Sequence, residues 1–275
     1  MRDRAGFVRG RAAAVSYLRR AGPGPALLCL HGIGSRGSSF DALLPHLPAD
    51  WNVIAWDAPG YGTSDPLARD WPVAADYAGA ALRLMDALGL DRVVVLGHSL
   101  GTLMGAALAV QAPGRVSRLF LTSCAAGHGA RAGGPLSPAA ASRLSALDRD
   151  GAAAFSAARA PRLLADPDGP ARAGVIADMA AIRMPGYGQA VRMLASGRLT
   201  ADLAQVRQPT TLIWGDGDIV TPRDQTDRAA AALGGAPVIT IENAGHALHA
   251  EAPRAVAEAI AAACVTSPIP ERIST

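Results

Sequence analysis

The sequence predicts an α/β fold: a mostly parallel, twisted sheet flanked by helices and interrupted by a helical insertion. Three observations predict it. Short apolar runs alternate with stretches of helical spacing over most of the chain, which is typical of right-handed βαβ units. Several runs are apolar at every position, as expected for strands that are buried on both faces. Between residues 127 and 205 the alternation stops and only helical spacing continues.

The apolar runs predict an edge hairpin in residues 1–20, followed by strands over 25–30, 51–56, 93–96, 116–122, 210–214 and 237–241. Helical spacing and punctuation by glycine and proline predict helices over 39–47, 74–90, 102–110, 223–233 and 254–265. Within the insertion, Val175, Met179 and Ile182 fall at i, i+4 and i+7. The insertion is too long for a plain connection. We therefore divide the chain into a first core part (1–126), a helical cap (127–205) and a second core part (206–275).

Length and composition favour a large buried core. The chain has 275 residues, half of them hydrophobic and 18% charged. All 26 basic residues are arginine, and the net charge is +3. The arginines are scattered among aspartates rather than gathered into a stripe with aromatic residues, so we expect no nucleic-acid partner. No apolar run approaches the roughly 18 residues that a membrane span needs, and no secretory signal is evident, so we expect no membrane association.

The three cysteines, Cys29, Cys124 and Cys264, lie far apart in apolar surroundings. Their spacing is not that of metal ligands, and an odd number does not suggest a disulfide framework. They are typical of small core residues in a reducing compartment. We therefore expect a cytoplasmic protein without a metal centre.

A candidate nucleophile stands where a predicted strand meets a predicted helix. The strand at residues 93–96 leads into Gly97-His98-Ser99-Leu100-Gly101, and an apolar helix follows. This context is typical of a nucleophile elbow, in which flanking glycines let a tight turn close around a strained serine. Without that context, G-x-S-x-G is a modest signal, since a βα turn can contain a serine by chance.

A serine hydroxyl needs a base and an acid that orients the base. Among the histidines, His246 follows the last predicted strand, where a loop would present it. The side chain of His98 is expected to point away from Ser99, and His249 is expected to be exposed. Asp218 follows the strand at 210–214 and has a better position than Asp216, which suits a turn. The order Ser99, Asp218, His246 is the order that α/β hydrolases use.

At this point the chain resembles the α/β-hydrolase-fold serine hydrolases over nearly all of its length apart from the insertion. Each motif alone is weak, but five of them occur in the family's order. They are His31-Gly32, Asp57-x-x-Gly60-x-Gly62-x-Ser64, Gly97-His98-Ser99-Leu100-Gly101, Trp214-Gly-x-x-Asp218 and Gly245-His246-x-x-x-x-Glu251-x-Pro253.

The resemblance implies Ser99 as the nucleophile, His246 as general base and then acid, and Asp218 as the orienting carboxylate. It also implies an oxyanion hole made by the backbone N–H groups of Leu100 and Ile33, with Gly34 as the alternative to Ile33. Asp57 is expected to be structural. The insertion lies where the family carries its cap, and Phe155, Met179, Met184, Tyr187 and Met193 are candidate pocket residues. Arg183 and Arg192 are expected to face the solvent.

The implied function is a serine hydrolase that cleaves a small carboxylic ester or lactone through an acyl-enzyme, with no metal or organic cofactor. The same residues would suit a C–C hydrolase of the meta-cleavage-product type, although that oxyanion loop is typically richer in Ser-Gly-x-Gly than residues 32–36. A cofactor-free perhydrolase or haloperoxidase is a third reading. A non-catalytic ligand receptor ranks below an enzyme, because all three triad positions are filled. The expected partner is a small-molecule substrate, and the sequence leaves a homo-oligomer open.

Overall fold

The computed structural model describes residues 7–266. Its strands form one sheet in the order β1-β2-β4-β3-β5-β6-β7-β8. The edge hairpin β1–β2 is antiparallel, as is the β2–β4 pair, and the remaining pairs are parallel. The strand bounds are β1 Val8–Ala12, β2 Val15–Arg20, β3 Ala26–Leu30, β4 Asn52–Trp56, β5 Val93–His98, β6 Val116–Thr122, β7 Thr210–Gly215 and β8 Val238–Ile241. This confirms the predicted mostly parallel sheet; residues 1–6 of the predicted hairpin segment lie outside the described residues.

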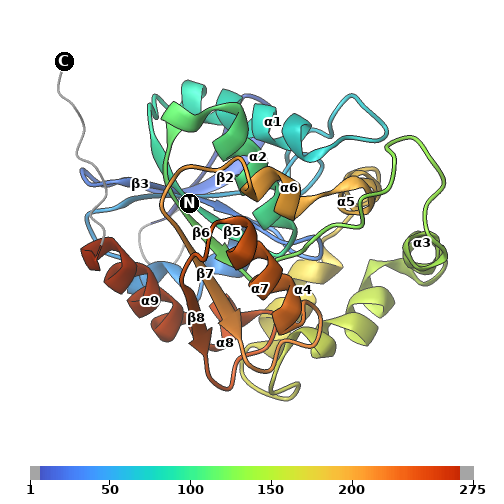
Figure 1. Ribbon diagram of the computed structural model, residues 1–275. Helices are drawn as coiled ribbons and strands as arrows, with labels where there is room; N and C mark the ends of the chain where they lie inside the picture. Colours follow the sequence, from blue (N-terminus) through green and yellow to red (C-terminus); the bar gives the residue numbers. More distant parts are fainter. Residues whose placement is uncertain (1–6, 267–275) are drawn as a thin grey trace.

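Helices connect the strands and flank the sheet (Figure 1). The α-helices are α1 Ala74–Ala87, α2 Leu100–Gln111, α3 Pro138–Arg159, α4 Arg172–Ala180, α5 Gly186–Ser196, α6 Leu199–Leu203, α7 Arg223–Ala232, α8 Leu248–Glu251 and α9 Pro253–Thr266. Shorter 3-10 turns are η1 Gly37–Phe40, η2 Leu44–His46, η3 Pro113–Arg115 and η4 Ala160–Leu163. Between residues 7 and 266, none of the helices combines the length and the apolar character that crossing a bilayer requires.

One predicted helix is wrong. Residues 39–47 form the two separate turns η1 and η2 rather than a continuous helix. Pro45 stands at the start of η2, and a proline there has no N–H to continue a helix from the preceding turn.

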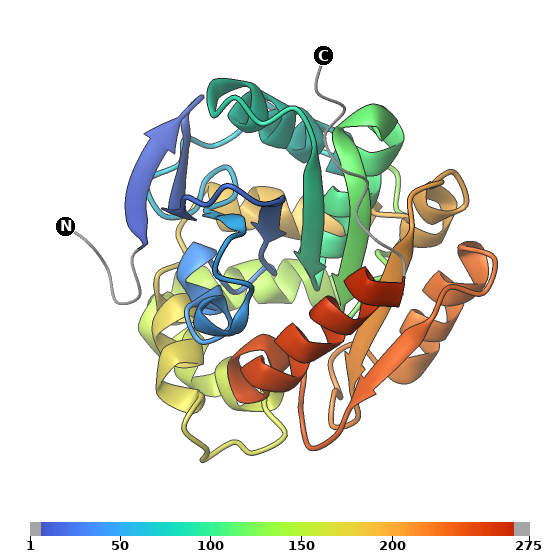
Figure 2. The ribbon, with the colours of Figure 1, turned by 90° about the vertical axis from the view of Figure 1, so that its left-hand side faces the viewer.

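Both faces of the sheet are buried. Successive residues of the central strands point to opposite sides, and an apolar cluster covers each side. In β3, Leu28 packs into one apolar cluster and Leu27 into the other; in β5, Val95 and Val94 divide in the same way. The first cluster includes side chains of α1 and α2, and the second includes side chains of α9. Figure 2 shows α9, in red, lying across the sheet. This two-sided burial explains why the strands are apolar at every position.

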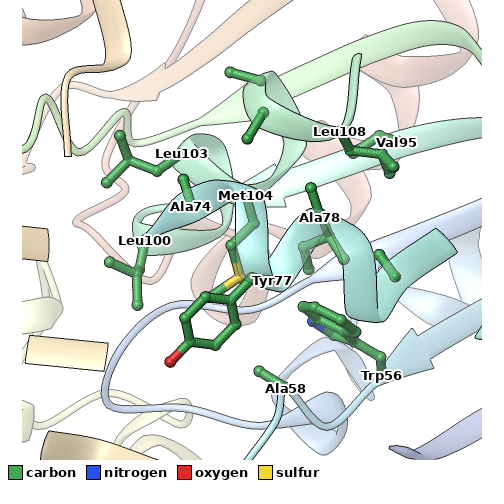
Figure 3. Close-up of a cluster of buried hydrophobic side chains, with 14 of the residues drawn as sticks. Trp56, Ala58, Ala74, Tyr77, Ala78, Val95, Leu100, Leu103, Met104 and Leu108 are labelled. Atoms are coloured by element: carbon green, nitrogen blue, oxygen red, sulfur yellow. The ribbon is translucent and has the colours of Figure 1, made fainter. Parts of the chain in front are cut away.

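Helix α2 is anchored where it leaves the sheet. Its first residue, Leu100, is buried beside Met104 and near Tyr77 of α1, as Figure 3 shows. One turn further on, a Cβ at Gly105 would lie 3.1 Å from Cγ1 of Val95, so the helix runs very close to β5. The start of α2, and with it the residue that precedes it, is therefore held in a rigid position.

The insertion, residues 127–205, contains α3, η4, α4, α5 and α6 and no strand; all of its residues are described. Figure 1 shows α3 and α5 at the right of the molecule and α6 nearer its middle, beside α2. Within α3, Gly151 has φ +73°, which breaks the helix into two parts. Helix α5 begins against the turn after β4, where a Cβ on Gly186 would overlap the backbone of Gly60. The boundaries 1–126, 127–205 and 206–275 as separate domains stay a prediction.

Candidate active site

Ser99 occupies a strained turn between β5 and α2. Its φ of +52° and ψ of −115° belong to a region that non-glycine residues rarely adopt. The turn can close because the flanking positions lack side chains. A Cβ on Gly101 would overlap the Leu30 carbonyl, and a Cβ on Gly97 would lie 2.6 Å from the Gly101 oxygen. A hydrogen bond from the Ser99 N–H to the Thr122 carbonyl, 2.9 Å long, fixes the turn on β6.

The structure brings Ser99, His246 and Asp218 into one hydrogen-bonded chain. His246 Nε2 lies 2.9 Å from Ser99 Oγ, and His246 Nδ1 lies 3.0 Å from Asp218 Oδ2. Ser99 follows β5, Asp218 follows β7 and His246 follows β8, so the three side chains meet at the carboxyl edge of the parallel strands. All three are buried. Residues far apart in the sequence are thus adjacent, as their positions after strands predict.

Asp218 lies in a cage of donors. The N–H groups of Val220 and Thr221 donate to its Oδ1, at 2.8 and 2.9 Å, and the Thr221 hydroxyl donates to its Oδ2 at 2.7 Å. Burial alone would raise the pKa of Asp218, but hydrogen bonds and charge from His246, together with the Thr221 donors, lower it to about 2. The carboxylate is therefore ionised near neutral pH.

The ionised carboxylate fixes the tautomer of His246. Because Asp218 can only accept hydrogen bonds, His246 Nδ1 carries the proton. Nε2 is then an acceptor, and it faces the hydroxyl of Ser99. The arrangement can withdraw a proton from that hydroxyl as it attacks an electrophile.

The loop after β3 lies against Ser99. A Cβ on Gly32 would lie 3.1 Å from the Ser99 Cβ, and Ile33 and Gly34 line the same cavity as Ser99. The Tyr61 hydroxyl donates to the Ile33 carbonyl at 2.7 Å and holds this loop. Leu100 is the first residue of α2, so its N–H has no partner within the helix; its side chain turns into the core and does not line the cavity. Tyr61 was not singled out from the sequence, although it lies in the motif 57–64.

Two further histidines, His98 and His249, lie beside the hydrogen-bonded chain of Ser99, His246 and Asp218. The ring of His98 lies 5.0 Å from that of His246 and 4.3 Å from that of His249, centroid to centroid. His98 does not point away, and His249 is buried rather than exposed; both expectations are wrong. Burial lowers the pKa of His249 to about 3 and lowers that of His98 well below its usual value, with the neighbouring histidines adding to both shifts. Both rings are neutral near pH 7.

Two residues that motifs single out have structural roles. His31 Nε2 accepts the N–H of Ala58 at 2.9 Å, so its Nδ1 carries the proton and donates to Gly32 at 2.8 Å. Asp57 accepts the N–H of Gly37 and the hydroxyl of Ser16, at 2.9 and 2.6 Å. The structural reading of Asp57 is confirmed by these contacts. In residues 7–266 no group of three or more potential ligands is placed to hold a metal ion.

A cavity of about 980 Å³ lies between the carboxyl edge of the sheet and the insertion. Among the five candidate pocket residues, Phe155, Met179 and Tyr187 line it. Met193 is fully buried elsewhere and Met184 is 53% exposed, and neither lines the cavity. Arg143, Arg159 and Arg162 of the insertion also line it. No local pattern predicts this, because the helix faces that turn inward depend on how the insertion packs.

The insertion is fastened to the rest of the chain on two sides of this cavity. On one side, Asp178 of α4 accepts from Arg36 Nε at 2.9 Å and from the Ser38 hydroxyl at 2.7 Å. On the other side, Glu251 accepts the N–H of Ala165 at 2.8 Å and the N–H of Gly245, the residue before His246, at 2.7 Å. The loops that carry Ile33 and His246 are therefore both tied to the insertion.

Fold and site together define a hydrolase of the α/β type. A family model described as the alpha/beta hydrolase fold matches residues 25–253, and the chain belongs to this family. The pimeloyl-(acyl-carrier protein) methyl ester esterase of Neisseria meningitidis is 32% identical over 234 residues, which cover 81% of this chain and 87% of that protein.

Solved structures share the whole architecture. A hydrolase from Pseudomonas aeruginosa matches with a TM-score of 0.80 at 27% identity, over 95% of this chain and 99% of the other. An enol-lactonase from Burkholderia xenovorans matches with a TM-score of 0.82 at 21% identity, over 94% of this chain and 100% of the other. The second likeness supports the fold alone.

Proposed function

We propose that this hydrolase cleaves a small carboxylic ester or lactone through an acyl-enzyme on Ser99. The observation that carries the proposal is the hydrogen-bonded chain from Ser99 through His246 to Asp218 at the floor of a cavity. Two features add support: Ser99 has the strained geometry of a nucleophile elbow, and a relative 32% identical to the chain is named as an ester hydrolase.

In the proposed mechanism, His246 Nε2 takes the proton of Ser99 as Oγ attacks the ester carbonyl. The negative charge on the carbonyl oxygen is met by the backbone N–H groups of Ile33 and Leu100. His246 then protonates the leaving alcohol, and the C–O bond breaks to leave an acyl group on Ser99. A water deprotonated by His246 attacks that acyl group, releases the acid and restores Ser99. Asp218 stays ionised and stabilises the imidazolium in each half-reaction.

The insertion acts in this proposal as a cap. It supplies one wall of the cavity, so it separates the acyl-enzyme from bulk water and selects the acyl group. The polar and apolar side chains of that wall, rather than the residues around Ser99, would distinguish substrates.

Hydrolysis of p-nitrophenyl acetate and butyrate tests the proposal. The wild-type protein should release p-nitrophenol with an initial burst and should be labelled by a fluorophosphonate. In Ser99→Ala, kcat should fall by a factor of about 10⁴–10⁶ and labelling should be abolished. Ser142→Ala, which changes an exposed serine of α3, serves as the matched control and should behave as wild type.

Equal rates of ester hydrolysis in wild type and Ser99→Ala would contradict the mechanism. A parallel screen with a lactone and a vinylogous 1,5-diketone decides which bond the site prefers. Turnover of the diketone alone would replace the ester proposal with C–C hydrolysis on the same residues.

A further inference from the structure

The cavity wall carries more positive than negative side chains. Two of its arginines have carboxylate partners: Arg36 pairs with Asp178, and Arg228 pairs with Asp224 at 2.5 Å. Three others belong to the insertion: one lies in the first part of α3, one at the end of α3 and one in η4. This set, called here the arginine cluster, consists of Arg143, Arg159 and Arg162.

The arginine cluster has no carboxylate partner within residues 7–266. The guanidinium of Arg159 lies over the ring of Phe155 at 4.7 Å from its centroid. Nε of Arg143 is buried and has no hydrogen-bond partner. These cations line a cavity beside the catalytic serine without a bound counter-charge from the described chain.

Arg159 lies close enough to Arg143 and to Arg162 for their charges to act on it. Partial burial lowers the pKa of Arg159, and the like charges of Arg143 and Arg162 contribute to that shift. Burial raises the pKa of Tyr187, and the charges of Arg143 and Arg159 partly offset the rise. Their mutual repulsion is an electrostatic cost in the free protein. An anion that entered the cavity would relieve this cost.

Guanidinium groups suit one class of anion. Each presents N–H donors in a planar fork that matches the oxygens of a carboxylate or a phosphate, and it stays charged across the working pH range. The rings of Phe155 and Tyr187 line the same cavity and can contact a hydrocarbon chain. The wall therefore offers apolar contacts for a chain and a set of oxyanion donors.

We propose that the substrate carries a second, oxyanionic group, a carboxylate or a phosphate, which the arginine cluster binds while the scissile ester lies at Ser99. This inference rests on the proposed ester hydrolysis and names its substrate class. Arg143, Arg159 and Arg162 are binding residues in this scheme, and none of them takes part in the bond-making and bond-breaking steps at Ser99.

Three substrates of equal chain length test the inference. The first is the mono-p-nitrophenyl ester of adipic acid, the second has its free carboxyl capped as a methyl amide, and the third carries a phosphate at that end. For the wild type, kcat/KM should be about tenfold or more higher for a charged substrate than for the capped one. The charged substrate with the higher kcat/KM shows whether the arginine cluster prefers a carboxylate or a phosphate.

Variants assign the preference to the arginine cluster. Arg143→Gln and Arg159→Gln should each lower kcat/KM for the charged substrate about tenfold, mainly through KM, and change the capped substrate less than twofold. Arg172→Gln is the matched control, because Arg172 is an exposed arginine of the insertion that does not line the cavity. Arg172→Gln should leave kcat/KM unchanged for both the charged and the capped substrate.

A binding measurement separates this inference from the proposed hydrolysis. Monomethyl adipate and its capped amide are titrated by calorimetry into Ser99→Ala, with and without Arg159→Gln. Tighter binding of the anion, lost in the double variant, supports the inference even if no ester is hydrolysed. Equal affinity for the two ligands, or equal wild-type kcat/KM for charged and capped substrates, overturns it while leaving ester hydrolysis intact.

Discussion

At the scale of single residues, the environment of Asp218 determines what His246 can do. Donors from Val220, Thr221 and His246 hold the carboxylate ionised, and the ionised carboxylate holds the imidazole with its proton on Nδ1. An amide in place of the carboxylate would offer His246 a donor as readily as an acceptor, so the opposite tautomer would become favourable.

Asp218→Asn should therefore lower kcat for p-nitrophenyl butyrate by about 10⁴ while the fold is retained. Circular dichroism and thermal unfolding check the fold, and steady-state kinetics check the rate. Thr221→Val is a milder companion, because it removes one donor to Asp218 and keeps the charge; we expect a loss of about tenfold. A loss of less than tenfold in Asp218→Asn would show that this carboxylate does not orient the base.

At the scale of elements, the loops that end the strands are held by contacts from other loops. The Tyr61 hydroxyl, in the turn after β4, supports the Ile33 carbonyl in the loop after β3. The peptide that follows this carbonyl belongs to the loop that lies against Ser99. A single hydrogen bond thus links the geometry of two loops at the sheet edge.

Tyr61→Phe should lower kcat/KM about tenfold and lower the free energy of unfolding by about 1 kcal/mol, since it removes one buried hydrogen bond and keeps the ring. Urea denaturation and ester hydrolysis measure the two effects. Tyr17→Phe, a change of a tyrosine in β2 that has no role in this loop, provides the control. An unchanged kcat/KM in Tyr61→Phe would mean that Ile33 keeps its position without this support.

The same scale explains what sequence patterns could and could not predict. The strands and the positions of Ser99, Asp218 and His246 depend on patterns a few residues long, at the ends of strands whose order follows from βαβ geometry. The burial of His249 and the inward face of Arg159 depend on packing between distant segments, which leaves no local pattern. Pro45 is a local signal that residues 39–47 do not form a continuous helix. The helical spacing of the apolar residues in the same segment points the other way, and it led to the wrong prediction.

At the scale of the whole molecule, neutral histidines beneath the cavity make stability depend on pH. His249 has a pKa of about 3 when folded, below its ordinary value near 6.5. Between these values the unfolded chain binds a proton that the folded protein does not. The stabilisation is therefore complete above pH 6.5 and is lost as the pH falls toward 3, with a slope of about 1.4 kcal/mol per pH unit for one such proton. The lowered pKa of His98 acts in the same direction.

The free energy of unfolding should accordingly fall between pH 6.5 and pH 4, as urea denaturation at a series of pH values would measure. His249→Gln, which stays neutral, should flatten this slope by up to about 1.4 kcal/mol per pH unit, whatever its effect at pH 7. His46→Gln is the control, because His46 is exposed. An identical slope in wild type and His249→Gln would show that His249 is already protonated in the folded protein.

The two fastenings of the insertion give the molecule a mechanical property. Glu251 holds the amide directly before His246 with one carboxylate oxygen and the amides of Ala165 and Asp166 with the other. Through Glu251, a displacement of Ala165 and Asp166 would therefore also move the loop that carries Gly245 and His246. Because Asp178 fastens the opposite side to Arg36, a molecule that filled the cavity and displaced the insertion would move the loops that carry Ile33 and His246 together.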